Sequence, residues 1–168
     1  TTPVVEETDT SSEVVSSEIS QTFQSENADF EYTLTWNTEL LDLSDSKYEG
    51  ATPNAPSFDI VGGGHITLAT DWIDSPGFTT AMLVNNLYYE GYADWPKSEP
   101  TATKAGANEV YYYNWDADSS CIIRYAAVKG VDEGLVFRLE DCDSNDMKSG
   151  EAFGGLVESL VIKDLPRK

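Results

Sequence analysis

Hydrophobic and polar residues alternate along the segment from Phe30 to Trp36, and the same alternation returns from Ile66 to Trp72. A period of two is typical of a β-strand that buries one face, so each segment predicts such a strand. A short apolar run at 57–61, which ends at three consecutive glycines, predicts another strand. Three more strands are predicted at residues 110–115, 121–128 and 135–142.

The spacing of apolar residues changes near the C-terminus, where positions one, three and four apart are apolar from Ala152 to Leu160. This spacing predicts an amphipathic helix. Ser149 is the expected N-cap, and Glu151 would lie favourably near the positive end of the helix dipole. Val161 and Ile162 would then close the domain as a last extended segment.

The segment from Phe78 to Tyr89 fits either a helix or a strand. Its apolar residues match a helical stripe, whereas Asn85 and Asn86 would also suit a turn. We favour the helix. Residues 42–56 and 92–106 contain proline and glycine, and both are expected to be loops. The predicted fold class is α+β, an antiparallel sheet packed with a C-terminal helix, and the alternative is an all-β sandwich.

The first 28 residues differ in composition from the rest of the chain. They are acidic and rich in serine and threonine, and Phe23 is their only aromatic residue. Such a segment buries too little apolar surface to offset the entropy of ordering. We therefore expect residues 1–28 to be a disordered tether and residues 29–168 to be a single globular domain. A short strand at Glu18–Gln24 that docks onto the domain is the alternative.

The net charge limits the classes of partner. Thirty acidic residues against ten basic residues give a formal charge of -20. This charge repels nucleic acid and anionic membrane surfaces, so we expect no nucleic-acid partner. No run of 18 apolar residues is present, which argues against a membrane-spanning segment. The sequence begins Thr1-Thr2-Pro3 without methionine, and we expect that a leader was removed. Acidic linkers rich in serine and threonine commonly separate an anchored terminus from a folded domain, so an N-terminal lipid or cell-wall anchor is one expectation for residues 1–28.

The two cysteines fit one hairpin. If the predicted strands at 121–128 and 135–142 fold back about a four-residue loop at 130–133, Cys121 lies directly opposite Cys142. The same register places Tyr125 beside Arg138, Ile123 beside Glu140, Ala126 beside Phe137 and Val128 beside Leu135. One face of this hairpin is mixed and the other is mostly apolar, as expected for a hairpin that lies on a core.

Opposite cysteines in an antiparallel pair approach closely enough to form a disulfide. A disulfide indicates an oxidising compartment, so we expect an exported protein, extracellular or in the cell envelope. Closing a loop of about 20 residues would contribute about 3 kcal/mol of stability. The alternative is a pair of reduced thiols that face each other in a cytosolic protein.

Aromatic residues form a candidate binding surface. A small core does not need all four tryptophans and nine tyrosines, so some of them should be partly exposed. Planar rings beside carboxylates and amides are typical of sugar-binding sites. The candidate glycan platform comprises Tyr88, Tyr92, Asp94, Trp95 and Asn85. The alternative is that these are ordinary core and rim aromatics.

An acidic turn offers a weaker candidate for metal binding. Alternate oxygen-bearing side chains can converge on Ca²⁺, and here they would be Asp141, Asp143, Asn145 and Asp146. The turn departs from a calcium loop, because Asp146 occupies the glycine position and Glu151 comes one residue early. A solvated acidic turn is the alternative, and we expect no resident cofactor.

The sequence offers little support for catalysis. His65 is the only histidine, and no serine lies in a nucleophile-elbow pattern. No free thiol remains if the disulfide forms. Paired carboxylates among thirty acidic residues keep a hydrolase as a third possibility, but we expect a protein without enzymatic activity.

The order of segments after the N-terminal region resembles that of the PsbP/Mog1-like lipoprotein domains. The resemblance rests on a strand that ends in Asp71-Trp72, several antiparallel strands, and the closing helix "EAFGGLVESLVIK", and it covers residues 58–163. It implies an antiparallel sheet with helices packed against it, and a non-enzymatic accessory role in the envelope. The expected function is therefore an accessory module that binds an envelope protein, and the alternative is a carbohydrate-binding β-sandwich that binds a surface glycan.

Overall fold

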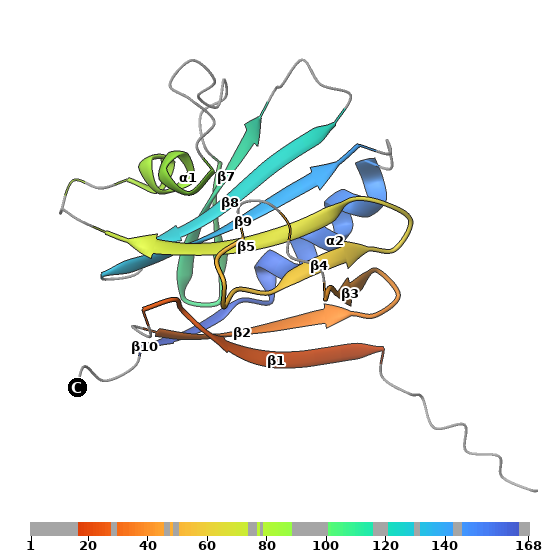
Figure 1. The fold of residues 1–168 in the computed structure, drawn as a ribbon, viewed down its shortest axis with the longest axis horizontal. Coiled ribbons are helices and arrows are strands. Elements are labelled where there is room, and N and C mark those ends of the chain that lie inside the picture. The colour runs from red at the N-terminus through yellow and green to blue at the C-terminus, as the bar shows by residue number, and fades with distance from the viewer. Residues whose placement is uncertain are drawn as a thin grey trace, which may run out of the picture.

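The computed structural model of the chain describes residues 17–27, 30–45, 48, 51–73, 77, 79–88, 101–115, 121–129, 132–142 and 146–164. Within these ranges the chain forms two antiparallel sheets and two helices (Figure 1). The two helices pack on opposite faces of the larger sheet. The predicted α+β class is confirmed, and the all-β alternative is wrong.

The larger sheet has the spatial order β3-β4-β5-β9-β8-β7-β6, and each neighbouring pair is antiparallel. Its strands are β3 (Leu41–Leu43), β4 (Ser57–Ile60), β5 (His65–Trp72), β9 (Glu133–Asp141), β8 (Ile122–Lys129), β7 (Asn108–Trp115) and β6 (Thr101–Ala105). The central strands β5 and β9 pair along their whole length, from His65 opposite Glu140 to Trp72 opposite Glu133. The register therefore determines which side chains share each face.

The smaller sheet has the order β1-β2-β10 and contains β1 (Glu18–Gln24), β2 (Phe30–Asn37) and β10 (Val161–Asp164). β1 lies inside the range 1–28 that we expected to be a disordered tether, so the expectation is wrong for Glu18–Gln24, and the alternative of a docked strand applies there. Residues 1–16 lie outside the described residues. β1 is almost entirely exposed, which is why its composition gave no signal of burial. It is held instead by its backbone ladder with β2 and by Phe23, which stacks on Tyr32 at 5.7 Å.

Side-chain hydroxyls tie the smaller sheet to the rest of the fold. The backbone N–H of Glu26, in the turn after β1, donates to Thr70 Oγ1 in β5 at 3.0 Å. The backbone N–H of Thr35 in β2 donates to Ser159 Oγ, just after helix α2, at 2.9 Å. The first bond therefore joins the smaller sheet to the larger sheet, and the second joins it to the end of α2.

Helix α1 (Thr80–Tyr88) confirms the helical alternative for residues 78–89. It packs Leu83 and Val84 against Tyr125 and Val136 of the larger sheet, and all four side chains are buried. We call the side of the larger sheet that carries α1 the α1 face.

Helix α2 (Asp146–Glu158) covers the opposite face, where Phe153 and Leu156 join the main core beside Phe137. The helix begins three residues before Ser149, so Ser149 is a fully buried helical residue and not the N-cap. The apolar period could not reveal this start, because the sequence of the first turn is mostly polar.

Two short strands were missed within the predicted loops. β3 overlaps residues 42–56 by two positions, and β6 lies in residues 92–106. β6 joins β7 through a two-residue turn, in which Gly106 has a φ of +59° that favours glycine. Among the described residues, neither helix is both long and apolar enough to cross a membrane.

Candidate functional site

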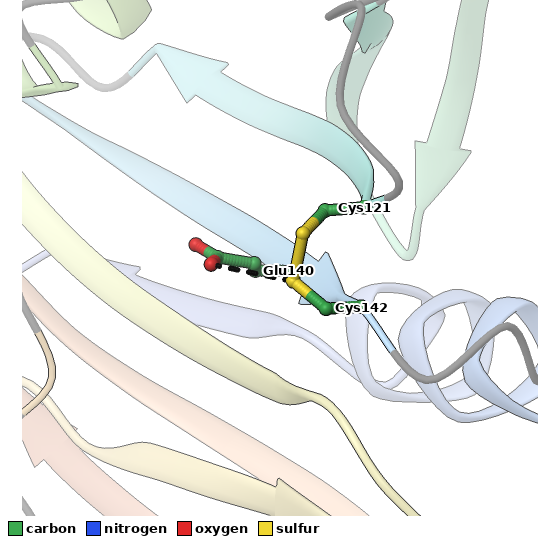
Figure 2. A group of neighbouring side chains, drawn as sticks. All are labelled: Cys121, Glu140 and Cys142. Atoms are coloured by element: carbon green, nitrogen blue, oxygen red, sulfur yellow. Dashed lines mark hydrogen bonds between the residues drawn. A yellow bond between two sulfur atoms is a disulfide. The ribbon is translucent and has the colours of Figure 1, made fainter.

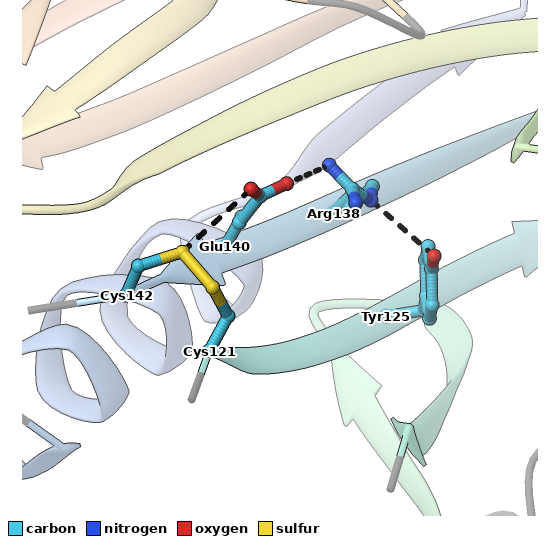
Figure 3. Close-up of polar contacts among 5 residues, drawn as sticks. All are labelled: Cys121, Tyr125, Arg138, Glu140 and Cys142. Carbon is cyan, nitrogen blue, oxygen red and sulfur yellow. Dashed lines mark hydrogen bonds and ion pairs between the residues drawn. A yellow bond between two sulfur atoms is a disulfide. The ribbon is translucent and has the colours of Figure 1, made fainter. Parts of the chain in front are cut away.

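The β8–β9 hairpin brings together the residues that the sequence placed on the cysteine face. All four predicted cross-strand pairs are present, including Tyr125 opposite Arg138 and Ile123 opposite Glu140. Cys121 and Cys142 flank the open end of this hairpin and form the predicted disulfide. We call Cys121, Tyr125, Arg138, Glu140 and Cys142 the Arg138 cluster (Figure 3).

The disulfide lies at the surface beside a carboxylate. The Cys142 Sγ atom is 3.8 Å from Glu140 Oε1, and Cys142 is exposed whereas Cys121 is half-buried (Figure 2). An oxidised sulfur carries no proton, so this contact becomes a hydrogen bond only in the reduced protein. Cys121, Cys142 and Glu140 lie close enough together to resemble a metal-ligand set, but sulfurs joined in a disulfide are not thiolate ligands.

Arg138 is the centre of the cluster. Its Nη1 atom forms an ion pair with Glu140 Oε2 at 2.5 Å, and its Nε donates to the hydroxyl of Tyr125 at 3.3 Å. The Arg138 side chain is 13% exposed and that of Glu140 is 28% exposed. Burial opposes the charge of the guanidinium, but Tyr125 and Glu140 outweigh it, so the pKa of Arg138 is raised. The group is therefore a fixed, permanently charged donor at the sheet surface.

A second group of side chains lies beside the Arg138 cluster, with His65 in β5, Asp59 in β4 and Tyr48 in the segment between β3 and β4. The ring of Tyr48 stacks on His65, with ring centroids 3.9 Å apart, and the hydroxyl of Tyr48 donates to Asp59 Oδ1. Burial lowers the pKa of His65, which the charge of Glu140 partly opposes, and the imidazole is favoured in its neutral form. The hydrogen bond to Asp59 raises the pKa of Tyr48, so its hydroxyl stays protonated. His65 is therefore half-buried beneath the ring of Tyr48. A lone histidine at the start of a strand is more often exposed to solvent.

A cleft of about 690 Å³ opens at the other end of the α1 face. It lies between the start of α1 and β7, and its lining includes Tyr111, Tyr113, Glu109 and Lys129. The Tyr113 hydroxyl lies 2.6 Å from Thr80 Oγ1, and either oxygen can be the donor. Hydrogen bonding to Glu109 raises the pKa of Tyr111. Both tyrosine hydroxyls are therefore held by the protein's own groups.

The predicted glycan platform lies mostly outside the described residues and stays a prediction. Asn85 and Tyr88 belong to α1, but the positions of their side chains are not described. Tyr92, Asp94 and Trp95 lie outside the described residues. The carbohydrate-binding alternative therefore receives no support from the part of the chain that the structure describes.

The candidate Ca²⁺ ligands are also only partly placed. Asp141 is the last residue of β9, and it is fully buried, which differs from the solvated turn that was the alternative. Asp146 is the first residue of α2, and Asp143 and Asn145 lie outside the described residues. Ca²⁺ binding at these four residues stays a prediction.

Sequence reasoning found part of this site and missed part. The hairpin register predicted that Tyr125, Arg138 and Glu140 would share the cysteine face, but it gave no sign that they bond to one another. Tyr48 was missed because it lies in the predicted loop 42–56, where no pattern links it to His65. The available signal was that Tyr48 is the single aromatic residue in an otherwise polar loop.

Comparison with known proteins identifies the fold. Neither a protein-family model nor a curated protein matches the sequence. The structure is similar to the solution structure of cyanobacterial PsbP (CyanoP) from Synechocystis sp. PCC 6803, with a TM-score of 0.54 and 13% sequence identity. The similarity covers 89% of this chain and 94% of that chain. It therefore extends beyond residues 58–163, the part of the chain covered by the sequence resemblance. The chain therefore has a PsbP-like fold.

Proposed function

We propose that this PsbP-like domain is a non-catalytic accessory module that acts outside the cytoplasm and binds a protein partner through the α1 face. The observation that carries the proposal is the Arg138 cluster next to the Tyr48–His65 stack. Together they place a fixed guanidinium and a carboxylate on β9 beside His65 of β5, on which the ring of Tyr48 stacks.

The composition and rigidity of this surface suit protein recognition. Arginine and tyrosine are enriched among the residues that dominate binding energy at protein interfaces. The Arg138 side chain is held on two sides, so little conformational entropy would be lost when a partner contacts its exposed portion. A partner that offers a backbone carbonyl or a carboxylate to Arg138 would gain a charge-assisted hydrogen bond.

The chemistry of the same residues favours binding over catalysis. Arg138 and Glu140 neutralise each other, and the two sulfurs are joined in a disulfide. Hydrogen bonding keeps Tyr48 protonated, and the stacking of His65 restricts its approach to a substrate. These features support a surface that contacts a partner without reacting with it.

One further feature supports a location outside the cytoplasm, and another limits the kind of partner. Disulfides form and persist in oxidising compartments, so the bond between Cys121 and Cys142 favours a location outside the cytoplasm. The formal charge of -20 keeps the domain in solution and favours a neutral or basic partner over an acidic one. An envelope protein with a neutral or basic surface is therefore the kind of partner that we propose.

A capture experiment with matched variants tests the proposal. The full chain is immobilised and exposed to envelope extract, alongside Arg138→Lys and Tyr48→Ala. Controls are Val161→Ala in β10 and Glu158→Gln at the end of α2, both of which are exposed and lie away from the α1 face. We expect one protein to be retained by the parent chain and both controls, and about tenfold less by each α1-face variant. Equal retention by all five proteins would contradict the proposal.

A further inference from the structure

The two sheets end in four edge strands, and β1 differs from the other three. β3 has three residues, β10 has four and includes Lys163, and β6 has five and includes Lys104. Short length and lysine are two of the devices by which natural proteins prevent an edge from pairing with another chain. β1 has seven residues and contains no lysine or proline.

The ladder between β1 and β2 is also regular. All seven residues of β1 pair in unbroken succession, from Glu18 opposite Asn37 to Gln24 opposite Glu31, so no bulge twists the edge away. In an antiparallel ladder every second residue directs its N–H and C=O away from the neighbouring strand. Among the described strands none pairs with the outer edge of β1. β1 therefore presents an uninterrupted row of backbone donors and acceptors.

The side chains of β1 define what could lie beside it. Ile19 is 46% exposed and Phe23 is half-buried, and both lie on the side of the sheet that faces the core. On the other side, the hydroxyls of Ser20 and Thr22 bond to Thr35 and Thr33 at 2.7 and 2.8 Å. A strand added to this edge would place apolar residues beside Ile19 and Phe23, at alternate positions, and polar residues beside the hydroxyls.

We propose that the outer edge of β1 binds an extended, basic segment of a partner protein by adding it to the smaller sheet as a fourth strand. Charge selects this occupant over a second copy of the chain. Each copy carries -20, so two copies repel each other, whereas a lysine-rich or arginine-rich segment is attracted. Glu18 at the start of β1 adds a local negative charge at the same edge.

This inference deepens the proposed function, because it specifies how a partner would be held, but it uses a different surface. The backbone of β1 supplies most of the binding, and alternating side chains supply the selectivity. The Arg138 cluster takes no part in it. Peptide binding at β1 and partner capture at the α1 face can therefore fail independently.

Hydrogen exchange with a synthetic probe tests the inference. The full chain is mixed with a nine-residue peptide in which valine alternates with lysine and threonine, and exchange of the β1 amides is followed by NMR. When the peptide is bound, we expect the exchange rate of every second β1 amide to fall at least about tenfold. The exchange rates of the β6 amides should not change. The same peptide with glutamate in place of lysine should bind at least about tenfold more weakly.

A pair of variants separates edge pairing from nonspecific attraction. Thr22→Lys places a cation on the β1 edge and should weaken peptide binding about tenfold, whereas Thr101→Lys on the exposed β6 edge and Arg138→Lys should leave it unchanged. Protection that appears elsewhere in the chain would overturn the inference. The inference would also be overturned if alternate β1 amides were already protected in the free monomer. A dimer detected by sedimentation, whose formation protects the β1 amides, would overturn it as well.

Discussion

Cys121 and Cys142 are 21 positions apart in the chain, yet their Cα atoms lie 3.9 Å apart across the open end of the β8–β9 hairpin. They connect the end of β9, a central strand, to the start of β8 beside it. The disulfide therefore closes the hairpin at the end opposite its turn, where the two strands would otherwise separate first.

Removing this cross-link should destabilise the domain. For Cys121→Ser with Cys142→Ser, we expect the free energy of unfolding to fall by about 3 kcal/mol, because the unfolded chain gains the freedom of an open loop. Urea denaturation followed by tryptophan fluorescence measures the change. Reductant should shift the parent protein toward the variant and leave the variant unchanged. An equally stable double variant would show that the disulfide contributes nothing.

Glu140 should slow the reduction of the disulfide. Its carboxylate lies 3.8 Å from Cys142 Sγ and repels an incoming thiolate. The ion pair with Arg138 reduces this repulsion, so Glu140→Gln should accelerate reduction by glutathione only about two- to fivefold. The rate is measured by quenched mass spectrometry. Glu151→Gln, which removes an exposed charge from α2, is the matched control and should react at the parent rate.

Gly134 provides room for helix α1. A Cβ atom at this position in β9 would lie 2.3 Å from Leu83 Cδ2, so one of the two must move. We expect Gly134→Ala to lower the free energy of unfolding by about 1–3 kcal/mol through overpacking. Thermal or urea unfolding measures the loss.

The matched control for Gly134 is a glycine of helix α2. A Cβ at Gly154 would meet no atom within 4 Å, so Gly154→Ala should stabilise the protein by about 0.5–1 kcal/mol through helix propensity. Combining Gly134→Ala with Leu83→Ala should cost less than the sum of the two single changes, because Leu83 is the side chain in the way. Strict additivity would rule out this explanation.

His65 should make the stability depend on pH. Burial lowers its pKa in the folded protein, so the folded state binds a proton less readily than the unfolded state. The stabilisation is therefore complete above the ordinary histidine pKa of about 6.5 and is lost as the pH falls below it. His65→Phe retains a ring for Tyr48 to stack on but does not titrate. We expect unfolding measured from about pH 7.5 to about pH 5 to show a smaller loss in this variant. Parallel curves would contradict the assignment.

The sequence could predict the central strands, because their side chains alternate between two environments. At least every second residue of β2 and β5 is buried. The register of the β8–β9 hairpin could be predicted from the positions of the two cysteines and the length of the loop between the strands. β1 and β6 could not be predicted in the same way. Both are largely exposed edge strands, so backbone pairing determines their structure and hydrophobic pattern does not.

The candidate site was predictable only where it lies within one hairpin. Tyr125, Arg138 and Glu140 could be placed on one face from the β8–β9 register alone. Tyr48 reaches His65 from a polar segment, and His65 lies opposite Glu140 only because β5 pairs with β9. Contacts between strands that are more than 60 residues apart in the chain depend on the fold, and a local pattern carries no information about them.

Site-specific cross-linking tests the proposed binding surface most directly. A photoreactive amino acid is placed at Ile123, which is half-buried on the α1 face beside the Arg138 cluster, or at Val161, which is 61% exposed in β10. Each full-length protein is irradiated in envelope extract. We predict that Ile123 forms a cross-link to one defined protein, that Arg138→Lys reduces this cross-link about tenfold, and that Val161 forms none to that protein. Cross-linking to the same protein from Val161 but not from Ile123 would contradict binding through the α1 face.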